Sequence, residues 1–204
     1  SNRYKFIFIH IPKTGGTSIE NIGNAHGKKW GRFHSEYKAK HRRNCRWNDR
    51  WHDKFILLHD NLKLNYDWFV IVRNPYERII SEYYCRWGGW GIKNKLKSSK
   101  EKFNDNIKKK ILKNHKKMSS HWVPQHFYID LNVKIHIIKY ENLTEEFNEL
   151  MKKYNYDITL NKHSNKGKKK FTLNDLSDEV ISLINNIYDK DFEMFGYKKI
   201  NTKN

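Results

Sequence analysis

The feature that most constrains the fold lies near the start of the chain, where a short apolar run breaks into a glycine-rich turn. Residues 4–10 predict a buried strand, and residues 17–22 predict the first helix, which Gly23 would end. Between them stands the sequence Pro12-Lys13-Thr14-Gly15-Gly16-Thr17-Ser18. A strand, a turn and a helix in this order aim backbone N–H groups and the positive end of the helix at one point, where an anion can bind. The segment therefore predicts a phosphate-binding loop.

The side chains of this loop also suit a phosphate. Two adjacent glycines, Gly15 and Gly16, allow the backbone to approach an oxyanion closely. Lys13 adds a positive charge, and Thr17 and Ser18 offer hydroxyls that can cap the helix or donate to a phosphate. The order differs from the nucleotide loop in which lysine follows the glycines, and the third glycine of the dinucleotide motif is missing. An ordinary turn with a capping threonine is the alternative interpretation.

A second junction between a strand and a helix follows the strongest apolar run of the chain, residues 67–73. Asn74 can cap a helix that has Pro75 at its first position. Apolar residues then recur at helical spacing, at Tyr76, Ile79, Ile80, Tyr83 and Tyr84. Arg73 ends the strand, and Ser81 is predicted to share a polar stripe with Asn74, Glu77 and Arg78. A guanidinium and a hydroxyl suit a phosphate monoester. The alternative is a capped helix whose arginine pairs with a surface carboxylate.

The rest of the chain alternates strands with helices. Further elements are predicted as strands at 54–59 and 134–140, a turn at 86–91, a helix near Thr144, a basic loop at 161–170 and a last helix from Ser177. Residues 93–117 contain eleven lysines and predict one basic helix, either amphipathic or solvated with a thin apolar stripe. We expect a single α/β domain over residues 1–204, with a central, mainly parallel sheet flanked by helices. Lys13 and Arg73 both follow strand ends, so we expect them to meet in one crevice.

The charge of the chain is strongly positive. Lysine and arginine total 41 against 22 acidic residues, for a formal net charge of +19. Such a charge attracts polyanions and anionic cofactors. A general bias toward lysine and asparagine is the alternative explanation. No apolar stretch is long enough to cross a membrane.

Cysteines and histidines give no metal motif. Cys45 and Cys85 are the only cysteines, so they form either one disulfide or two free thiols, and zinc sites with the usual cysteine spacing are excluded. His121 and His126 lack the spacing of a helical ligand pair. We expect no metal.

Taken together, the two junctions resemble a known pair of motifs. Residues 70–84 comprise an apolar strand, an arginine, a proline two residues later and a serine eight residues after the arginine. This pattern resembles the 3′-phosphate motif of sulfotransferases that use 3′-phosphoadenosine 5′-phosphosulfate (PAPS), and the first loop resembles their 5′-phosphosulfate loop. Residues 121–125, 138–143 and 188–197 are similar to segments of Golgi carbohydrate sulfotransferases. The chain is shorter than typical Golgi members and lacks their cysteine content.

The resemblance implies a P-loop-like sulfotransferase fold and the transfer of a sulfuryl group from PAPS to a carbohydrate hydroxyl, leaving 3′-phosphoadenosine 5′-phosphate. Lys13 would contact the bridging oxygen of the leaving phosphate, and the 5′-phosphate would be held by Thr14, Gly15, Gly16, Thr17 and Ser18. Arg73 and Ser81 would hold the 3′-phosphate. Lys166 and Lys168 would close over the nucleotide.

The acceptor hydroxyl needs a base, and we expect it to be His59. This histidine ends a predicted strand before the 3′-phosphate motif, and related heparan-type sulfotransferases carry a histidine base in a comparable place. His10 is the rival candidate, although it lies inside the first strand. His121, Trp122 and Gln125 are expected to contact the substrate, a carbohydrate or glycan acceptor that the basic charge allows to be acidic.

Two other functions fit parts of the sequence. A nucleotide-dependent, kinase-like phosphotransferase would require ATP and Mg²⁺. Two absences oppose it: the sequence has no nucleotide loop in which lysine follows the glycines, and it has no obvious carboxylates to bind the metal. A non-enzymatic binder of polyanions or nucleic acid would use the basic helix at 93–117, although we do not expect nucleic acid as the partner. We expect the Golgi lumen if an upstream anchor has been removed, and the cytoplasm otherwise.

Overall fold

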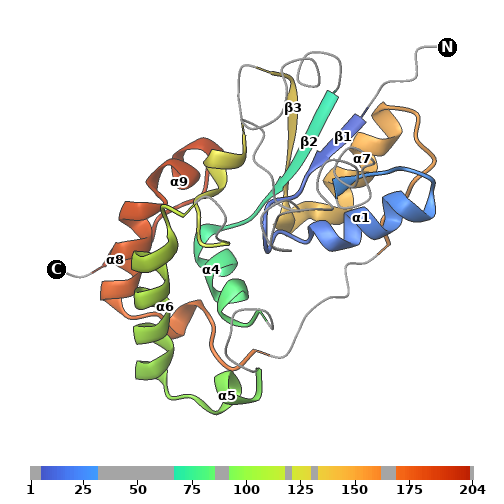
Figure 1. Ribbon diagram of the computed structural model, residues 1–204. Coiled ribbons are helices and arrows are strands. Elements are labelled where there is room, and N and C mark those ends of the chain that lie inside the picture. The colour runs from blue at the N-terminus through green and yellow to red at the C-terminus, as the bar shows by residue number, and fades with distance from the viewer. Residues whose placement is uncertain are drawn as a thin grey trace, which may run out of the picture. The chain divides into compact units, whose positions relative to one another are not determined.

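The computed structural model describes residues 6–31, 67–85, 92–117, 121–129, 133–161 and 169–202 (Figure 1). The predicted strand at 54–59, the turn at 86–91 and most of the loop at 161–170 lie outside these residues. Contacts divide the chain into two units. We call Ser1–Val72 with Phe127–Ser164 the sheet unit, and Arg73–His126 with Asn165–Asn204 the helical unit. The single domain expected from the sequence stays a prediction.

The sheet unit contains a parallel sheet, as predicted, with three strands among its described residues. The strands are β1 (Phe6–Ile9), β2 (Asp67–Val72) and β3 (Ile135–Lys139), in the order β1-β2-β3. Phe8 pairs with Phe69, and Phe69 pairs with His136. The helices of this unit are α1 (Gly16–Ala25) and α7 (Leu143–Lys153), with the 3₁₀ turn η4 (Tyr140–Asn142) before α7. A further 3₁₀ turn, η3, spans Gln125–Tyr128.

Helices α1 and α7 pack on the same face of the sheet (Figure 1). The shared core is aromatic, with the ring centroids of Phe6 and Phe69 only 4.7 Å apart. Its members are Phe6, Phe8, Ile19, Trp30, Phe69, Ile71, Ile138, Leu143, Phe147, Leu150, Met151, Tyr154, Ile158 and Leu160. The strand residues that point to the other face, such as Ile7, Val70 and Val72, are also buried. Burial on both faces explains why the strands are continuous apolar runs instead of alternating patterns.

The prediction that Gly23 ends the first helix is wrong. Helix α1 continues to Ala25, and Gly23 lies inside it. Its lack of a side chain serves packing, because a Cβ there would lie 2.4 Å from Cε3 of the Trp30 indole. The Trp30 Nε1 donates a hydrogen bond to the carbonyl of Phe6 at 3.0 Å, which fixes the ring over the helix.

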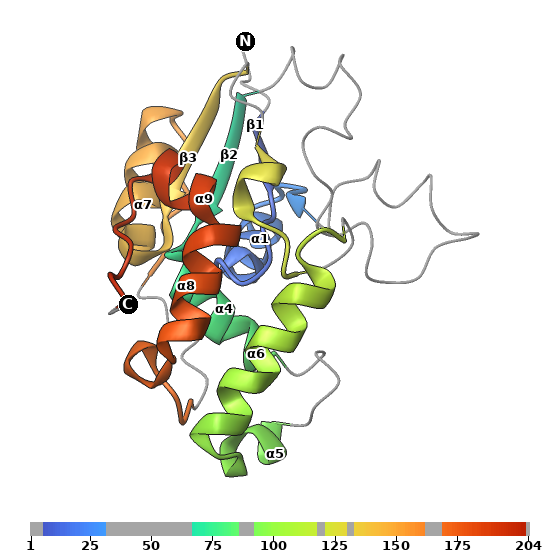
Figure 2. The ribbon, with the colours of Figure 1, turned by 90° about the vertical axis from the view of Figure 1, so that its left-hand side faces the viewer.

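The helical unit consists of helices and turns throughout its described residues. Its elements are α4 (Pro75–Tyr83), α5 (Ile92–Lys97), α6 (Lys100–Asn114), η5 (Leu173–Asp175), α8 (Asp178–Ile187) and α9 (Asp189–Phe195). Helix α6 packs against α8, as Figure 2 shows. The five apolar residues predicted for α4 are all buried in the core of this unit, together with Val180, Ile184 and Tyr188. None of the described helices combines the length and hydropathy that a membrane crossing requires.

The single basic helix predicted over 93–117 is two helices. The chain breaks at Ser98 and Ser99, where the Ser99 hydroxyl caps α6 by accepting from the backbone N–H of Lys102 at 3.3 Å. The apolar stripe of α6, formed by Phe103, Ile107 and Ile111, is fully buried. Helix α6 is therefore an amphipathic core helix whose lysines cover its outer face.

One predicted helix cap, at Asn74, and one predicted helix start, at Ser177, are confirmed. The side chain of Asn74 accepts from the backbone N–H groups of Tyr76 and Glu77, at 3.0 and 3.4 Å, with Pro75 at the first helical position. The hydroxyl of Ser177 accepts from the N–H of Val180 at 3.4 Å and begins α8. Each cap satisfies donors that the first turn of a helix leaves unpaired.

Candidate active site

The loop between β1 and α1 is a tight turn with two residues in the left-handed region. Lys13 has φ 68° and Gly15 has φ 88°. Glycine adopts this conformation without strain, whereas for lysine it costs about 1–2 kcal/mol. Gly15 is also the N-cap of α1, and the first turn of this helix contains no acidic residue. Strain of this kind persists where the surrounding structure holds it, and it clusters at ligand-binding turns.

A buried pair of polar residues supports the loop from below. His10 Nδ1 lies 2.9 Å from Glu20 Oε1, and both residues are buried. The His10 ring rests directly on Gly16, where a Cβ would come within 2.4 Å of its Cδ2 atom. Gly16 is thus required for the close approach of the helix to the imidazole. His10 is the other histidine considered as a base in the sequence analysis. In the structure it follows β1 and contacts Glu20, and so links the end of the strand to helix α1.

The predicted phosphate ligands of the loop differ in their exposure. The Thr14 hydroxyl is buried and donates to the carbonyl of Ile11 at 2.8 Å, so it stabilises the turn itself. Thr17 is exposed, and Lys13 and Ser18 are partly exposed. The side chains of these three residues can therefore reach a ligand outside the loop. The N–H of Ser18 donates to the carbonyl of Gly15 at 3.0 Å, the first bond of the helical turn.

In the helical unit, the backbone of Arg73 is held by the side chain of Gln125. The Arg73 N–H donates to Gln125 Oε1 at 2.9 Å, and Gln125 Nε2 donates to the Arg73 carbonyl at 2.8 Å. The guanidinium pairs with Glu77 at 3.3 Å, and Lys169 pairs with the same carboxylate at 3.5 Å. The position of Arg73 is therefore fixed through its backbone. Its guanidinium and the Lys169 ammonium share the partly exposed carboxylate of Glu77.

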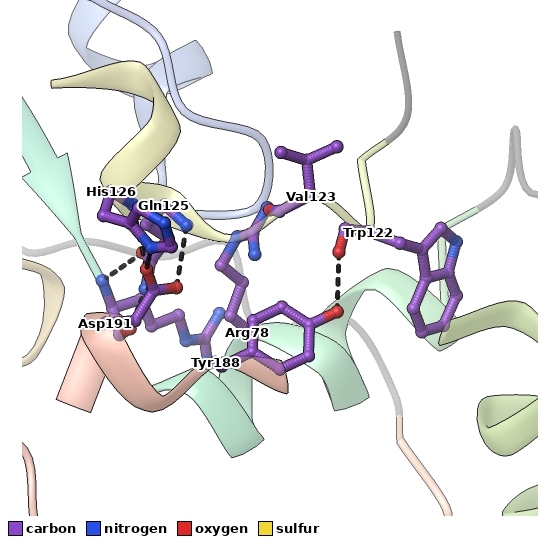
Figure 3. A network of polar contacts seen from close by, with 8 residues as sticks. Arg78, Trp122, Val123, Gln125, His126, Tyr188 and Asp191 are labelled. Carbon is purple, nitrogen blue, oxygen red and sulfur yellow. Dashed lines mark hydrogen bonds and ion pairs between the residues drawn. The ribbon is translucent and has the colours of Figure 1, made fainter. Parts of the chain in front are cut away.

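Gln125 is itself held by the fully buried carboxylate of Asp191, on α9 (Figure 3). Asp191 accepts from the backbone N–H groups of Gln125 and His126, at 2.7 and 2.9 Å. The side chain of His126 lies 2.8 Å from the same carboxylate, through its Nδ1 atom. One buried carboxylate thus organises the turn that holds Arg73.

Arg78 does not belong to an exposed polar stripe, which corrects the sequence prediction. Its side chain is buried and its Nη2 donates to the carbonyls of His121 and Val123, at 2.7 and 3.0 Å (Figure 3). The hydroxyl of Tyr188 donates to the Trp122 carbonyl at 2.6 Å. Burial raises the pKa of this phenol well above its usual range, so the group stays a donor. Arg78 and Tyr188 together hold residues 121–123 through their carbonyls.

The three predicted substrate contacts occupy this same segment. Gln125 is fully buried with its amide bound to Arg73 and Asp191, and Trp122 is also buried. His121 is more accessible, with 26 % of its side chain exposed. Ser81 lies partly exposed on α4. The predicted base His59 and the predicted nucleotide contacts Lys166 and Lys168 lie outside the described residues.

A further cluster in the helical unit was not predicted from the sequence. Glu82 at the end of α4, Cys85 just after it and His121 bring one potential ligand atom each to within 4.8 Å of one another. Burial by itself lowers the pKa of His121, but hydrogen bonds to Cys85 and Glu82 outweigh it and raise the pKa to about 9. The spacing of 36 residues between Cys85 and His121 gives no local motif that sequence reasoning could use.

Replacing Asp191 by alanine should destabilise the protein, because four polar groups of Gln125 and His126 would lose a buried acceptor. We expect Asp191→Ala to lower the free energy of unfolding by about 3–5 kcal/mol, measured by urea denaturation. Asp189→Ala on the same helix is the matched control. Asp189 is exposed and pairs with Lys199 at the surface, so its loss should cost at most about 1 kcal/mol. Equal effects of the two substitutions would contradict the role of Asp191.

Comparison with known proteins assigns the family. A sequence model of the sulfotransferase family matches residues 1–198. This span includes both the glycine-rich loop after β1 and the Arg73 junction after β2. No curated protein and no solved structure matched the chain. Because the family match covers nearly the whole chain, this protein belongs to the sulfotransferase family and its chemistry is sulfuryl transfer.

Proposed function

We propose that this sulfotransferase transfers a sulfuryl group from PAPS to a hydroxyl of a carbohydrate acceptor and releases 3′-phosphoadenosine 5′-phosphate. Family membership implies PAPS as the donor. The observation that carries the proposal is the turn from Lys13 to Gly16, which combines two left-handed residues with the N-terminus of a ten-residue helix.

This turn is suited to the 5′-phosphosulfate. The N-terminus of α1 supplies a positive partial charge, and its first turn contains no carboxylate to oppose an anion. Thr17 and Ser18 can add hydroxyl donors, since both are accessible. The left-handed Lys13 stands at the start of the turn, and its ammonium can neutralise charge on the bridging oxygen. Thr14 contributes by shaping the turn through its bond to Ile11.

Arg73 is suited to the 3′-phosphate. A guanidinium can bind a phosphate through two parallel hydrogen bonds, and the Gln125 amide fixes the backbone from which it extends. Glu77 is its partner in the ligand-free chain, so phosphate would compete for or share this ion pair. Ser81 would add a hydroxyl donor. Within the sheet unit, β1 and β2 are parallel neighbours, so their carboxyl ends lie at the same edge of the sheet.

The reaction exchanges one sulfur–oxygen bond for another. The acceptor oxygen attacks sulfur as the bond to the phosphate bridging oxygen breaks in line with it, as in phosphoryl transfer. His59 would take the proton from the acceptor hydroxyl, and Lys13 would stabilise the charge that develops on the leaving phosphate. Catalysis would then depend mainly on positioning and on fixed positive charge, with no covalent intermediate on the protein.

The acceptor is proposed to be a glycan. The net charge of +19 favours an acidic one, and Lys166 and Lys168 would close over the donor nucleotide. Among the expected acceptor contacts, His121 has an accessible side chain, whereas Trp122 and Gln125 are buried and would act by holding the segment in place.

Removing the Arg73 guanidinium should weaken binding of the product nucleotide selectively. We expect Arg73→Ala to raise the Kd for 3′-phosphoadenosine 5′-phosphate about 10- to 100-fold in calorimetry, because a charged hydrogen bond is worth about 1.5–3 kcal/mol. Binding of adenosine 5′-phosphate, which lacks the 3′-phosphate, should change little. Lys93→Ala removes an exposed charge of the same unit and serves as the control. An equal loss for both nucleotides would refute the 3′-phosphate assignment.

The proposed base should affect turnover without affecting the nucleotide. We expect His59→Gln to lower kcat by about 10²–10⁴-fold and to leave the Kd for the product nucleotide unchanged. Lys13→Asn is the informative comparison, because asparagine tolerates the left-handed conformation while the charge is lost. This variant should lower kcat and also weaken nucleotide binding. Full activity of His59→Gln would remove His59 from the mechanism.

A transfer screen tests the acceptor class. With radiolabelled PAPS as donor, we expect sulfate incorporation into glycans, with acidic glycans better acceptors than neutral ones of the same length because of the positive charge. Raising the salt concentration should reduce this preference. Transfer to non-carbohydrate hydroxyls with none to any glycan would contradict the proposal.

A further inference from the structure

The cluster of Glu82, Cys85 and His121 lies within the helical unit and has no part in the proposed transfer chemistry beyond the acceptor contact expected of His121. Glu82 and Cys85 come from the C-terminal end of α4, and His121 belongs to the segment whose carbonyls are held by Arg78 and Tyr188. Two separate parts of the chain therefore supply the three side chains. All three belong to the described residues.

The distances within the cluster suit a small tetrahedral ion. His121 Nδ1 and Glu82 Oε2 are 3.1 Å apart, and all three ligand atoms lie within 4.8 Å of one another. Around a tetrahedral zinc ion with ordinary bond lengths, neighbouring ligand atoms stand about 3.3–3.6 Å apart. The nitrogen and oxygen are slightly closer than this range, and the sulfur lies within 4.8 Å of both, so side-chain adjustments of about 1 Å would bring all three atoms to coordination distance.

The chemistry of the three groups selects the kind of metal. A thiolate, an imidazole and a carboxylate are the three ligand types that zinc uses in proteins. Magnesium and calcium prefer oxygen ligands, and they do not compete well for a site that contains sulfur and nitrogen. The two negative charges of a thiolate and a carboxylate neutralise a divalent ion. We propose that Glu82, Cys85 and His121 form a zinc site with water in the fourth position.

The burial of the cluster and the hydrogen bonds to its backbone support a bound zinc ion. Glu82 and Cys85 are buried, whereas His121 is 26 % exposed and gives the ion a path from solvent. The ammonium of Lys95, itself buried, donates to the Cys85 carbonyl at 2.8 Å and fixes the backbone that presents the thiol. Arg78 fixes the backbone of His121 in the same way, through its carbonyl. The ion would tie the end of α4 to the segment that continues into Gln125.

Zinc binding can be measured without any sulfotransferase assay. Protein free of any histidine tag is dialysed against zinc in buffer that contains excess magnesium, and the bound metal is counted by elemental analysis. We expect one zinc per chain. Substitution by Co²⁺ should give the visible bands of a tetrahedral ion and a near-ultraviolet band from a cobalt–thiolate bond. Zinc binds a thiolate and a neutral imidazole, so binding should release protons from Cys85 and His121 and the affinity should increase with pH.

Matched variants assign the ligands. Cys85→Ser and His121→Asn should each weaken zinc binding at least 100-fold, and Cys85→Ser should abolish the thiolate band. Cys45→Ser removes the only other cysteine and should keep both the stoichiometry and the band. Zinc should also raise the Tm of the wild type and of Cys45→Ser, but not of Cys85→Ser.

Several results would overturn the site. These are the absence of stoichiometric zinc, a cobalt spectrum without a thiolate band, or zinc retained by Cys85→Ser. Circular dichroism of the metal-free variants checks that each one folds, and the wild-type cobalt spectrum tests the site without any substitution. Nucleotide binding and sulfate transfer are separate measurements, so failure of the zinc site leaves the proposed function standing, and the reverse also holds.

Discussion

The burial of the parallel sheet is the constraint on which the arrangement of this protein depends. Apart from Asp67 at the start of β2, the residues of β1 and β2 are apolar and buried on both faces, so these strands leave no room for polar chemistry along their length. Polar groups can appear only where the strands end. The glycine-rich turn follows β1 and Arg73 follows β2, and these strands are parallel neighbours. Chemistry at the carboxyl ends of the strands is a direct consequence of that burial.

Each of the two segments proposed to bind a phosphate is supported by a buried carboxylate. Glu20 and His10 lie beneath the turn after β1, and Gly16 allows the imidazole to come close. Asp191 holds the Gln125 turn, which in turn clamps the backbone of Arg73. A buried carboxylate is costly unless its hydrogen bonds are satisfied, and satisfied networks are rigid. The residues that would meet the ligand are thus positioned by residues that do not meet it.

Sequence reasoning succeeded where a local pattern carried the information. The three described strands, the cap at Asn74, the helix start at Ser177 and the buried apolar face of α4 follow from periodicity and capping chemistry. It failed where a distant partner decided the outcome. Gly23 looked like a helix end because its packing against Trp30 could not be seen, and Arg78 looked like a surface residue because its acceptors stand more than 40 residues away.

The sequence by itself determined the α/β class, the family and the two strand-to-helix junctions that are proposed to bind phosphates, because a strand, a glycine turn and a capped helix are short-range patterns. Tertiary structure alone decided which polar groups are buried and with whom. The Asp191–Gln125–Arg73 chain and the grouping of Glu82, Cys85 and His121 join residues far apart along the chain. No local spacing encodes such contacts, since they arise only when packed helices bring separate segments to the same place.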